Sequence, residues 1–245
     1  MTGILLSELI ETDMNLPIVN GETWALPIQR SLPDIVAERV IDAIREGHLK
    51  PGDRIVEVQL AKKLGVSRGP LREALKMLEA AQVVESQRAR GTFVANISPA
   101  HISQMMVVRA TLEGMAARLV ARSRTPESIA PLEDIHRRLV DAAHAGLADE
   151  MRTLDWLFHE TVCRSSNNEF LLRAWSAISN LIRVFLRQYA GFDHDVSGVL
   201  ANHQRFLTVL RTGTPDEAEA IFRNTILQSS YSSLKIEPPE GLAID

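Results

Sequence analysis

Two groups of side chains in this 245-residue sequence have the types and spacing of binding sites. Arg68, Arg72 and Lys76 recur every four residues, so on a helix they form one cationic stripe that suits an anion. Asp155 and His159 are also four residues apart, and a carboxylate and an imidazole at that spacing can ligate one divalent metal ion. Both patterns also have a structural explanation, because basic helix faces are often only solvated and Asp–His pairs are often only polar contacts.

The residues around the basic stripe predict a helix-turn-helix. Residues 58–64 read as a short helix that stops at Gly65, and Ser67 is a suitable N-cap for the next helix, with Pro70 in its first turn. The apolar positions opposite the stripe are Leu71, Leu75 and Leu78. In such a layout the second helix enters the major groove of DNA, where an arginine fork discriminates guanine by about 1–3 kcal/mol.

A basic hairpin is predicted after this helix. Residues 82–86 and 92–95 are short β-prone runs, and the segment 87–91 between them carries Arg88 and Arg90. Two arginines on a recognition helix and two on a hairpin tip favour DNA binding over a merely solvated face. Lys76 is expected to neutralise phosphate rather than to read bases.

The region 30–96 resembles the winged-helix DNA-binding domain of the GntR family of bacterial transcription regulators. The strings that carry the resemblance are 47–55 (GHLKPGDRI), 60–68 (LAKKLGVSR) and 90–94 (RGTFV). The resemblance implies that the following residues contact operator DNA: Ser67, Arg68, Gly69 and Arg72 from the recognition helix, and Arg90 and Gly91 from the wing. Gly69 stands where the family usually has a threonine, so a hydroxyl contact is missing there.

Charge and composition divide the chain. The formal net charge is −4, yet residues 29–96 hold 12 basic against 9 acidic residues, which gives the DNA-binding part a local positive field. Residues 1–28 are an acidic N-terminal extension, residues 97–235 form a second domain and residues 236–245 a tail. Cys163 is the only cysteine, so no internal disulfide forms. Without a secretory signal or an apolar span, we expect a cytoplasmic protein with no membrane contact.

The second domain is expected to be an antiparallel bundle of six or seven helices, which makes the fold class mainly α. Periodic apolar patterns predict the helices 99–122, 126–145, 148–165, 168–190, 195–212 and 215–233. The loop signals between them are short, as they are in antiparallel bundles.

The region 100–233 is similar to the all-helical FCD effector domain of the FadR subfamily. The segments that carry this resemblance are 108–113, 155–159 and 202–207. In metal-containing members, an aspartate and three histidines hold zinc or nickel, which can bind a small carboxylate effector. Asp155, His159 and His203 match three of these ligands.

The fourth ligand position falls on Thr225, and a hydroxyl is a poor ligand for such a metal. In this register the site is weak or empty unless water, the effector itself or Asn224, one position away, completes it.

Three arginines are candidates for binding the charge of an acidic effector. Arg109 lies in an apolar stretch and needs an anionic ligand or Glu113, its structural partner at i+4. Arg183 and Arg187 form a second pair at the same spacing, and the sequence leaves open which of the three faces a cavity.

These observations predict a transcription regulator that binds an inverted-repeat operator as a homodimer and is controlled by a small organic acid. Two alternatives use the same metal ligands: a metal-dependent hydrolase, and a regulator that senses only the metal. A hydrolase also needs a general acid or base beside the metal, and no second motif supplies one.

Overall fold

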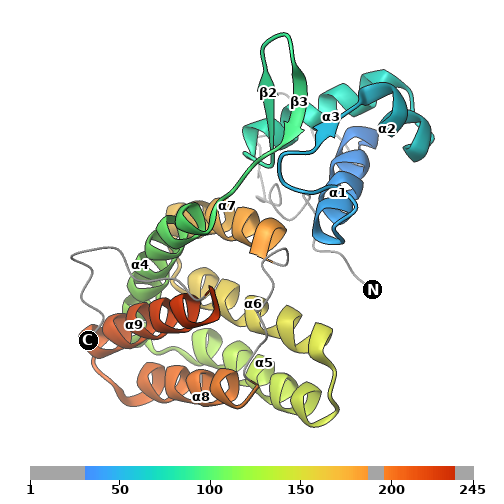
Figure 1. Cartoon of the computed structure of the whole chain (residues 1–245). Helices are drawn as coiled ribbons and strands as arrows, with labels where there is room; N and C mark the ends of the chain where they lie inside the picture. The colour runs from blue at the N-terminus through green and yellow to red at the C-terminus, as the bar shows by residue number, and fades with distance from the viewer. Residues whose placement is uncertain (1–30, 187–195, 235–245) are drawn as a thin grey trace, which may run out of the picture. The chain divides into compact units, whose positions relative to one another are not determined.

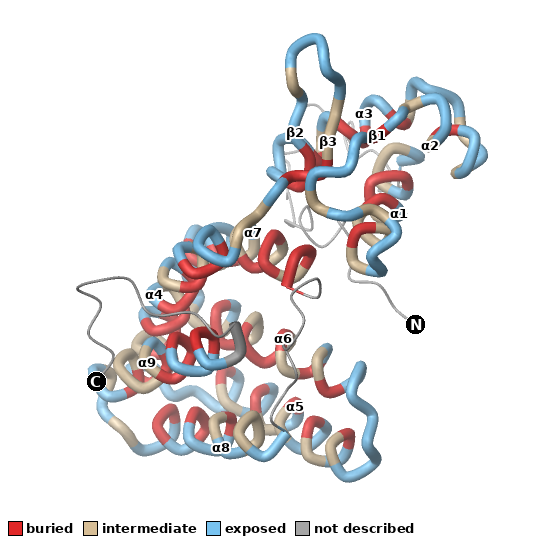
Figure 2. The backbone as a smooth tube through the Cα atoms, viewed as in Figure 1, coloured by how far each residue is buried: buried red, intermediate tan, exposed pale blue. Residues whose placement is uncertain are grey.

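The computed structural model describes residues 31–186 and 196–234. The chain divides into two compact units between Asn96 and Ile97. Figure 1 shows a small unit of helices and strands and a larger unit made of helices. Each unit has its own buried interior (Figure 2).

The first unit contains three described helices, and they bear out the predicted helix-turn-helix. Their bounds are α1 Leu32–Arg45, α2 Glu57–Leu64 and α3 Arg68–Ala80. Helix α1 begins with a reciprocal cap, in which the Ser31 hydroxyl accepts from the Asp34 amide and the Asp34 carboxylate accepts from the Ser31 amide. Helix α3 buries the predicted apolar side, namely Leu71, Ala74, Leu75 and Leu78. This side packs against α1 and leaves the basic stripe exposed.

The turn between α2 and α3 depends on Gly65. This residue has φ +69° in the left-handed region, which a residue without Cβ adopts at little cost. The amide of Val66 donates to the carbonyl of Ala61 at 3.0 Å, and this bond closes the end of α2. Ser67 is the N-cap of α3, as predicted, but its side chain makes no capping bond.

The wing is a three-stranded antiparallel sheet rather than the isolated hairpin that the sequence predicted. Its strands are β1 Arg54–Ile55, β2 Val84–Gln87 and β3 Gly91–Val94, in the order β1-β3-β2. Strand β1 pairs Arg54 with Phe93 and Ile55 with Thr92. A two-residue strand is too short for a detectable alternation of apolar and polar residues, so β1 could not be predicted from that pattern.

The second unit is a bundle of six described helices, as the apolar periodicity predicted. Their bounds are α4 Pro99–Ser123, α5 Pro126–His144, α6 Ala148–Ser165, α7 Glu169–Leu186, α8 Val196–Thr212 and α9 Pro215–Leu234. Proline stands at the first position of α4, α5 and α9, where its missing amide costs little. The expected extension of α7 to residue 190 lies outside the described residues. Among the described helices, none combines the length and apolar character needed to cross a bilayer.

Helices α4 and α9 lie along each other in the bundle (Figure 1). Gly114 of α4 permits this approach, since a Cβ there would lie 3.0 Å from the backbone oxygen of Glu219. Aromatic rings fill the space beside this pair. Phe206 of α8 stacks on Phe222 of α9 with ring centroids 4.1 Å apart, and both side chains are fully buried.

Gly114→Ala should therefore destabilise the helical unit. The added methyl must push α9 away, and overpacking of this kind costs about 1–3 kcal/mol, which exceeds the roughly 1 kcal/mol gained from helix propensity. Thermal melts would measure the loss. Gly69→Ala in α3 is the matched control, because nothing lies within 4 Å of a Cβ there, and it should not lower Tm. An unchanged or higher Tm for Gly114→Ala would contradict the close approach.

Candidate functional site

The first candidate site is the exposed face of α3. Arg68, Arg72 and Lys76 are all exposed on this face, as the four-residue spacing predicted. Glu57, in the first turn of α2, also reaches it. One oxygen of Glu57, Oε2, accepts from Arg72 Nε at 2.8 Å and from Arg68 Nη2 at 3.3 Å. The sequence analysis did not single out Glu57, because residues 11 and 15 positions apart are brought together only by the turn at Gly65.

The wing adds cationic groups to this unit. Arg88 and Arg90 are exposed at the turn between β2 and β3, and the Arg90 guanidinium lies 5.7 Å from the centre of the Phe93 ring. Gly91 has φ +101°. A Cβ at Gly91 would lie 3.5 Å from Nε of Arg54, so the guanidinium of Arg54 covers this glycine. Arg54 is therefore a further candidate for DNA contact that the sequence analysis missed, because β1 itself was not predicted.

The second candidate site is a cavity of about 220 Å³ inside the bundle. The predicted metal ligands Asp155, His159 and His203 line it together with Arg109 and Thr225. The other wall includes Met106, Phe206, Ile226 and three serines of α9, Ser229, Ser230 and Ser232. A wider hollow of about 470 Å³ between α8 and α9 is more open to solvent and contains none of the predicted ligands.

The three predicted metal ligands converge from two helices. The Oδ1 atom of Asp155 lies 3.1 Å from Nε2 of His203 and 3.9 Å from Nε2 of His159, and all three ligand atoms lie within 4.8 Å of one another. Asp155 and His159 come from α6 and His203 from α8. Phe158 helps to fix His203, because their rings stack with centroids 4.4 Å apart.

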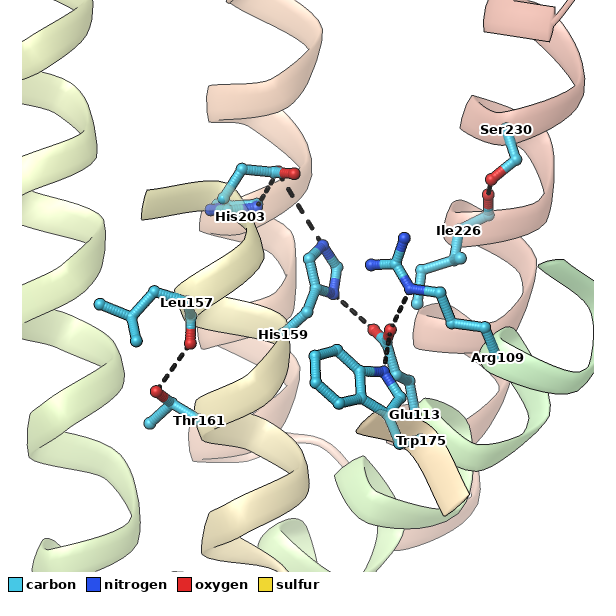
Figure 3. A network of polar contacts seen from close by, with 10 residues as sticks. Arg109, Glu113, Leu157, His159, Thr161, Trp175, His203, Ile226 and Ser230 are labelled. Atoms are coloured by element: carbon cyan, nitrogen blue, oxygen red, sulfur yellow. Dashed lines mark hydrogen bonds and ion pairs between the residues drawn. The ribbon is translucent and has the colours of Figure 1, made fainter. Parts of the chain in front are cut away.

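A fully buried carboxylate, Glu113, holds the wall of this cavity together (Figure 3). Its Oε1 accepts from Arg109 Nε at 2.6 Å and from Trp175 Nε1 at 2.7 Å. Its Oε2 lies 2.5 Å from Nδ1 of His159. One carboxylate thus joins α4, α6 and α7, and every polar group in the cluster gains a partner that compensates its burial.

The charges around Glu113 determine its ionisation. Burial by itself would raise the pKa of this carboxyl, but Arg109, His159 and the hydrogen bond from Trp175 lower the pKa to about 2. Because Glu113 is ionised, Nδ1 of His159 carries a proton and donates it to the carboxylate. The Nε2 atom of His159 is then the ring nitrogen that lies towards Asp155, which is the orientation that a metal ligand needs.

Burial favours the neutral form of His203. Burial lowers the pKa of His203, and the opposing effect of Asp155 does not reverse this shift. Its Nδ1 atom is buried and has no hydrogen-bond partner among the described residues. Neutral imidazoles and an aspartate are the donor set that zinc and nickel accept.

The ligand atoms must move closer together to hold one metal. Two ligands that each lie about 2.1 Å from a tetrahedral metal are about 3.4 Å apart, so a pair separated by as much as 4.8 Å must close by more than an ångström. Thr225 of α9 is buried and lines the cavity, whereas Asn224 does not and accepts from Arg223 Nε at 3.3 Å. The alternative in which Asn224 completes the site by a one-residue shift is therefore unsupported.

The three candidate arginines differ in position. Arg109 lines the cavity, is 6% exposed and lies with its guanidinium carbon 4.2 Å from the centre of the Trp156 ring. Arg183 lies 5.5 Å from the centre of the same ring but does not line the cavity. Arg187 lies outside the described residues. Figure 3 shows the Arg109 side chain directed towards the imidazole of His159, so only Nε of its fork is occupied by Glu113.

Comparisons with known proteins match a separate family model to each of the two units. Residues 33–94 match the bacterial regulatory proteins of the gntR family, and residues 104–228 match the FCD domain. An uncharacterised HTH-type transcriptional regulator, YdhC of Bacillus subtilis, is 31% identical over 179 residues, which cover 72% of this chain and 79% of the relative.

Another relative is the gluconate operon transcriptional repressor of Bacillus licheniformis. It is 27% identical over 182 residues, which cover 71% of this chain and 73% of the repressor. Among solved structures, a GntR transcriptional regulator from Rhodococcus sp. RHA1 aligns with a TM-score of 0.67 at 19% identity. That alignment covers 84% of this chain and 98% of the Rhodococcus chain, and it shows the shared fold.

The stability of the bundle should depend on the charge of Glu113. The pKa of this group is lowered from 4.5 to about 2 in the folded state, so its ionised form contributes about 3 kcal/mol above pH 5, which is lost as the pH falls towards 2. Glu113→Gln should be strongly destabilised at pH 7, because Arg109 stays buried beside a neutral amide.

The difference in unfolding free energy between wild type and Glu113→Gln should then narrow by about that amount between about pH 5 and pH 2. Urea unfolding at several pH values would measure it. Glu160→Gln removes a carboxylate paired with exposed Arg164 and is the control that should show little change. A difference that is the same at all pH values would contradict the assigned role of Glu113.

Proposed function

We propose that this chain, which belongs to the FCD-containing branch of the GntR family of bacterial transcription regulators, reads an operator with α3 and the wing and senses a small carboxylate in the bundle cavity. Its relatives are transcription regulators and not enzymes, so the hydrolase alternative is set aside. The observation that carries the proposal is the cavity in which Arg109 lies beside Asp155, His159 and His203.

The exposed cations of the first unit support the assignment of its DNA contacts. Arg68 and Arg72 lie one turn apart on α3, where their forks can reach guanine edges in the major groove. Lys76 continues the stripe and supplies charge towards phosphate. The Ser67 hydroxyl makes no capping bond to α3. We expect this hydroxyl and the backbone at Gly69 to contact phosphate at the helix start. Arg90 and Gly91 present the wing to the minor groove.

The cavity supports an acidic effector for electrostatic reasons. Arg109 has one carboxylate partner through Nε, and its terminal nitrogens are free to bind a second carboxylate in a bidentate manner. Asp155, His159 and His203 would hold a zinc or nickel ion, which supplies open coordination positions to an oxygen of the effector. The serines of α9 offer hydroxyl groups to the rest of the molecule. A relative that represses a gluconate operon is consistent with an organic acid as the signal.

Effector binding must alter DNA affinity through a difference between two conformations. The cavity is lined by α4, and α4 starts at Pro99, directly after the connection that leaves the wing. A ligand that pulls Arg109 or the α6 and α8 ligands together would shift α4 and thereby reorient the DNA-binding unit. In a homodimer, such a shift changes the spacing of two recognition helices on an inverted repeat. A regulator that senses only the metal is the second candidate, and Arg109 disfavours it because a metal signal does not need a guanidinium.

Arg72→Ala should reduce the preference for operator over random DNA by about 1–3 kcal/mol, because it removes a bidentate base contact. Lys76→Ala should weaken binding to both DNAs more evenly, since a phosphate contact is independent of sequence. Gel-shift titrations at two salt concentrations would separate these effects. Unchanged operator preference in the double variant Arg68→Ala/Arg72→Ala would exclude α3 as the recognition helix.

Thr225→His should tighten zinc or nickel binding, because an imidazole replaces a weak hydroxyl at the wall that faces the three ligands. We expect metal affinity to rise at least roughly tenfold, because the loss of even an outer contact lowers metal affinity by that factor in known metal sites. Calorimetric titration of chelator-treated protein would measure it, and melts should show a higher Tm with metal. His159→Ala, which removes one of the three predicted ligands, is the matched control. Equal and negligible affinity in all three proteins would show that the Asp155–His159 pair is structural.

A further inference from the structure

We infer that Glu57 is a specificity-determining residue, which positions the two arginines of the recognition helix and weakens their attraction for non-operator DNA. The inference rests on the proposed role of α3 in reading the operator. Glu57 does not belong to α3, but one of its carboxylate oxygens binds both Arg68 and Arg72.

The geometry of these bonds leaves each arginine partly available. Arg72 uses only Nε for Glu57, at 2.8 Å, so both of its terminal nitrogens can still form a bidentate contact with guanine. Arg68 uses Nη2 at 3.3 Å and keeps Nε and the other terminal nitrogen. The Arg68 and Arg72 side chains are 55% and 56% exposed, whereas Glu57 is 28% exposed. The carboxylate is thus less exposed than the two arginine side chains that it binds.

Such a carboxylate has two physical effects on DNA binding, and only the first distinguishes one DNA from another. An exposed arginine loses side-chain entropy when it binds DNA. If Glu57 already holds the arginine side chains in the conformation that matches the operator, less entropy is lost when they bind the operator. A negative charge beside the stripe also opposes binding to any phosphate backbone, which is the main source of affinity for random DNA. The first effect increases the ratio of operator to non-operator affinity, whereas the second lowers the affinity for both DNAs, because phosphate contacts are independent of sequence.

The ion pairs are electrostatically coupled, as the ionisation of Glu57 indicates. The hydrogen bond from Arg72 is the largest effect and lowers the pKa of Glu57; burial opposes this shift, and the hydrogen bond from Arg68 adds to it. A structural role for Glu57 is available as well, because an acidic residue in the first turn of α2 favours the helix dipole. That role changes the stability of the domain but does not distinguish one DNA from another.

The test compares Glu57→Gln with Glu73→Gln in the full-length protein. Glu73 is exposed on α3 and its substitution removes the same charge, so it controls for the general field. The two probes are the duplex that wild-type protein selects from a random-sequence library and a shuffled duplex of equal composition. Fluorescence anisotropy over a range of salt concentrations gives both affinities, and thermal melts confirm that each variant is folded.

We expect Glu57→Gln to bind the shuffled duplex about three- to tenfold more tightly, with a salt dependence steeper by about one phosphate contact. The affinity of Glu57→Gln for the selected duplex should rise by a smaller factor or fall. The ratio of selected-duplex to shuffled-duplex affinity should therefore drop at least threefold. Glu73→Gln should change both affinities by a similar factor and preserve the ratio. In the Arg68→Ala/Arg72→Ala background, Glu57→Gln should have no further effect on the ratio.

The inference would be overturned if Glu57→Gln left the ratio of selected-duplex to shuffled-duplex affinity unchanged, or changed this ratio as Glu73→Gln does. An equal effect of Glu57→Gln with and without the two arginines would overturn it too, since Glu57 would then act independently of them. Failure of the proposed function has a different signature, because the Arg68→Ala/Arg72→Ala protein would then keep its preference for the selected duplex. If the double variant loses that preference and Glu57→Gln keeps it, only the role of Glu57 is rejected.

Discussion

The buried carboxylate of Glu113 is the interaction on which the helical unit depends. It accepts from Arg109 and Trp175 and contacts His159, so three helices are fixed to each other by one charged group. Removing any partner would leave an uncompensated charge or donor in the interior. The same contacts orient one imidazole towards the cavity and leave part of one guanidinium for a ligand. Stability and ligand recognition therefore share the same atoms.

This arrangement makes the cavity sensitive to what it binds. In the proposed function, a second carboxylate at the terminal nitrogens of Arg109 would share with Glu113 a guanidinium that also lies over Trp156. A metal at His159 strengthens the donation from its Nδ1 to Glu113, because a bound cation increases the acidity of the other ring nitrogen. Either proposed ligand would thus change a bond to α4, the helix that directly follows the wing in the chain. Under this proposal, ligand binding and the position of α4 would be coupled through the contacts of Glu113.

A carboxylate also organises the first unit, but at the surface. Glu57 brings Arg68 and Arg72 together on α3 with the same kind of charge-assisted bond that Glu113 makes in the interior. The consequence differs with burial. In the interior the pair is required for stability, since its members cannot be solvated, whereas an exposed pair contributes little stability and mainly affects where the arginines point.

The sequence by itself determined the helices, the helix-turn-helix and the residues that could bind DNA or metal. Those features follow from local periodicity, caps and the glycine at position 65, which act within a few residues of each other. Only the tertiary structure decided that Arg109 rather than Arg183 faces the cavity, that Thr225 rather than Asn224 lines it, and that β1 and Glu57 belong to the DNA-binding unit. These choices depend on how helices rotate and pack against one another, and a single sequence does not encode that rotation in any short-range pattern.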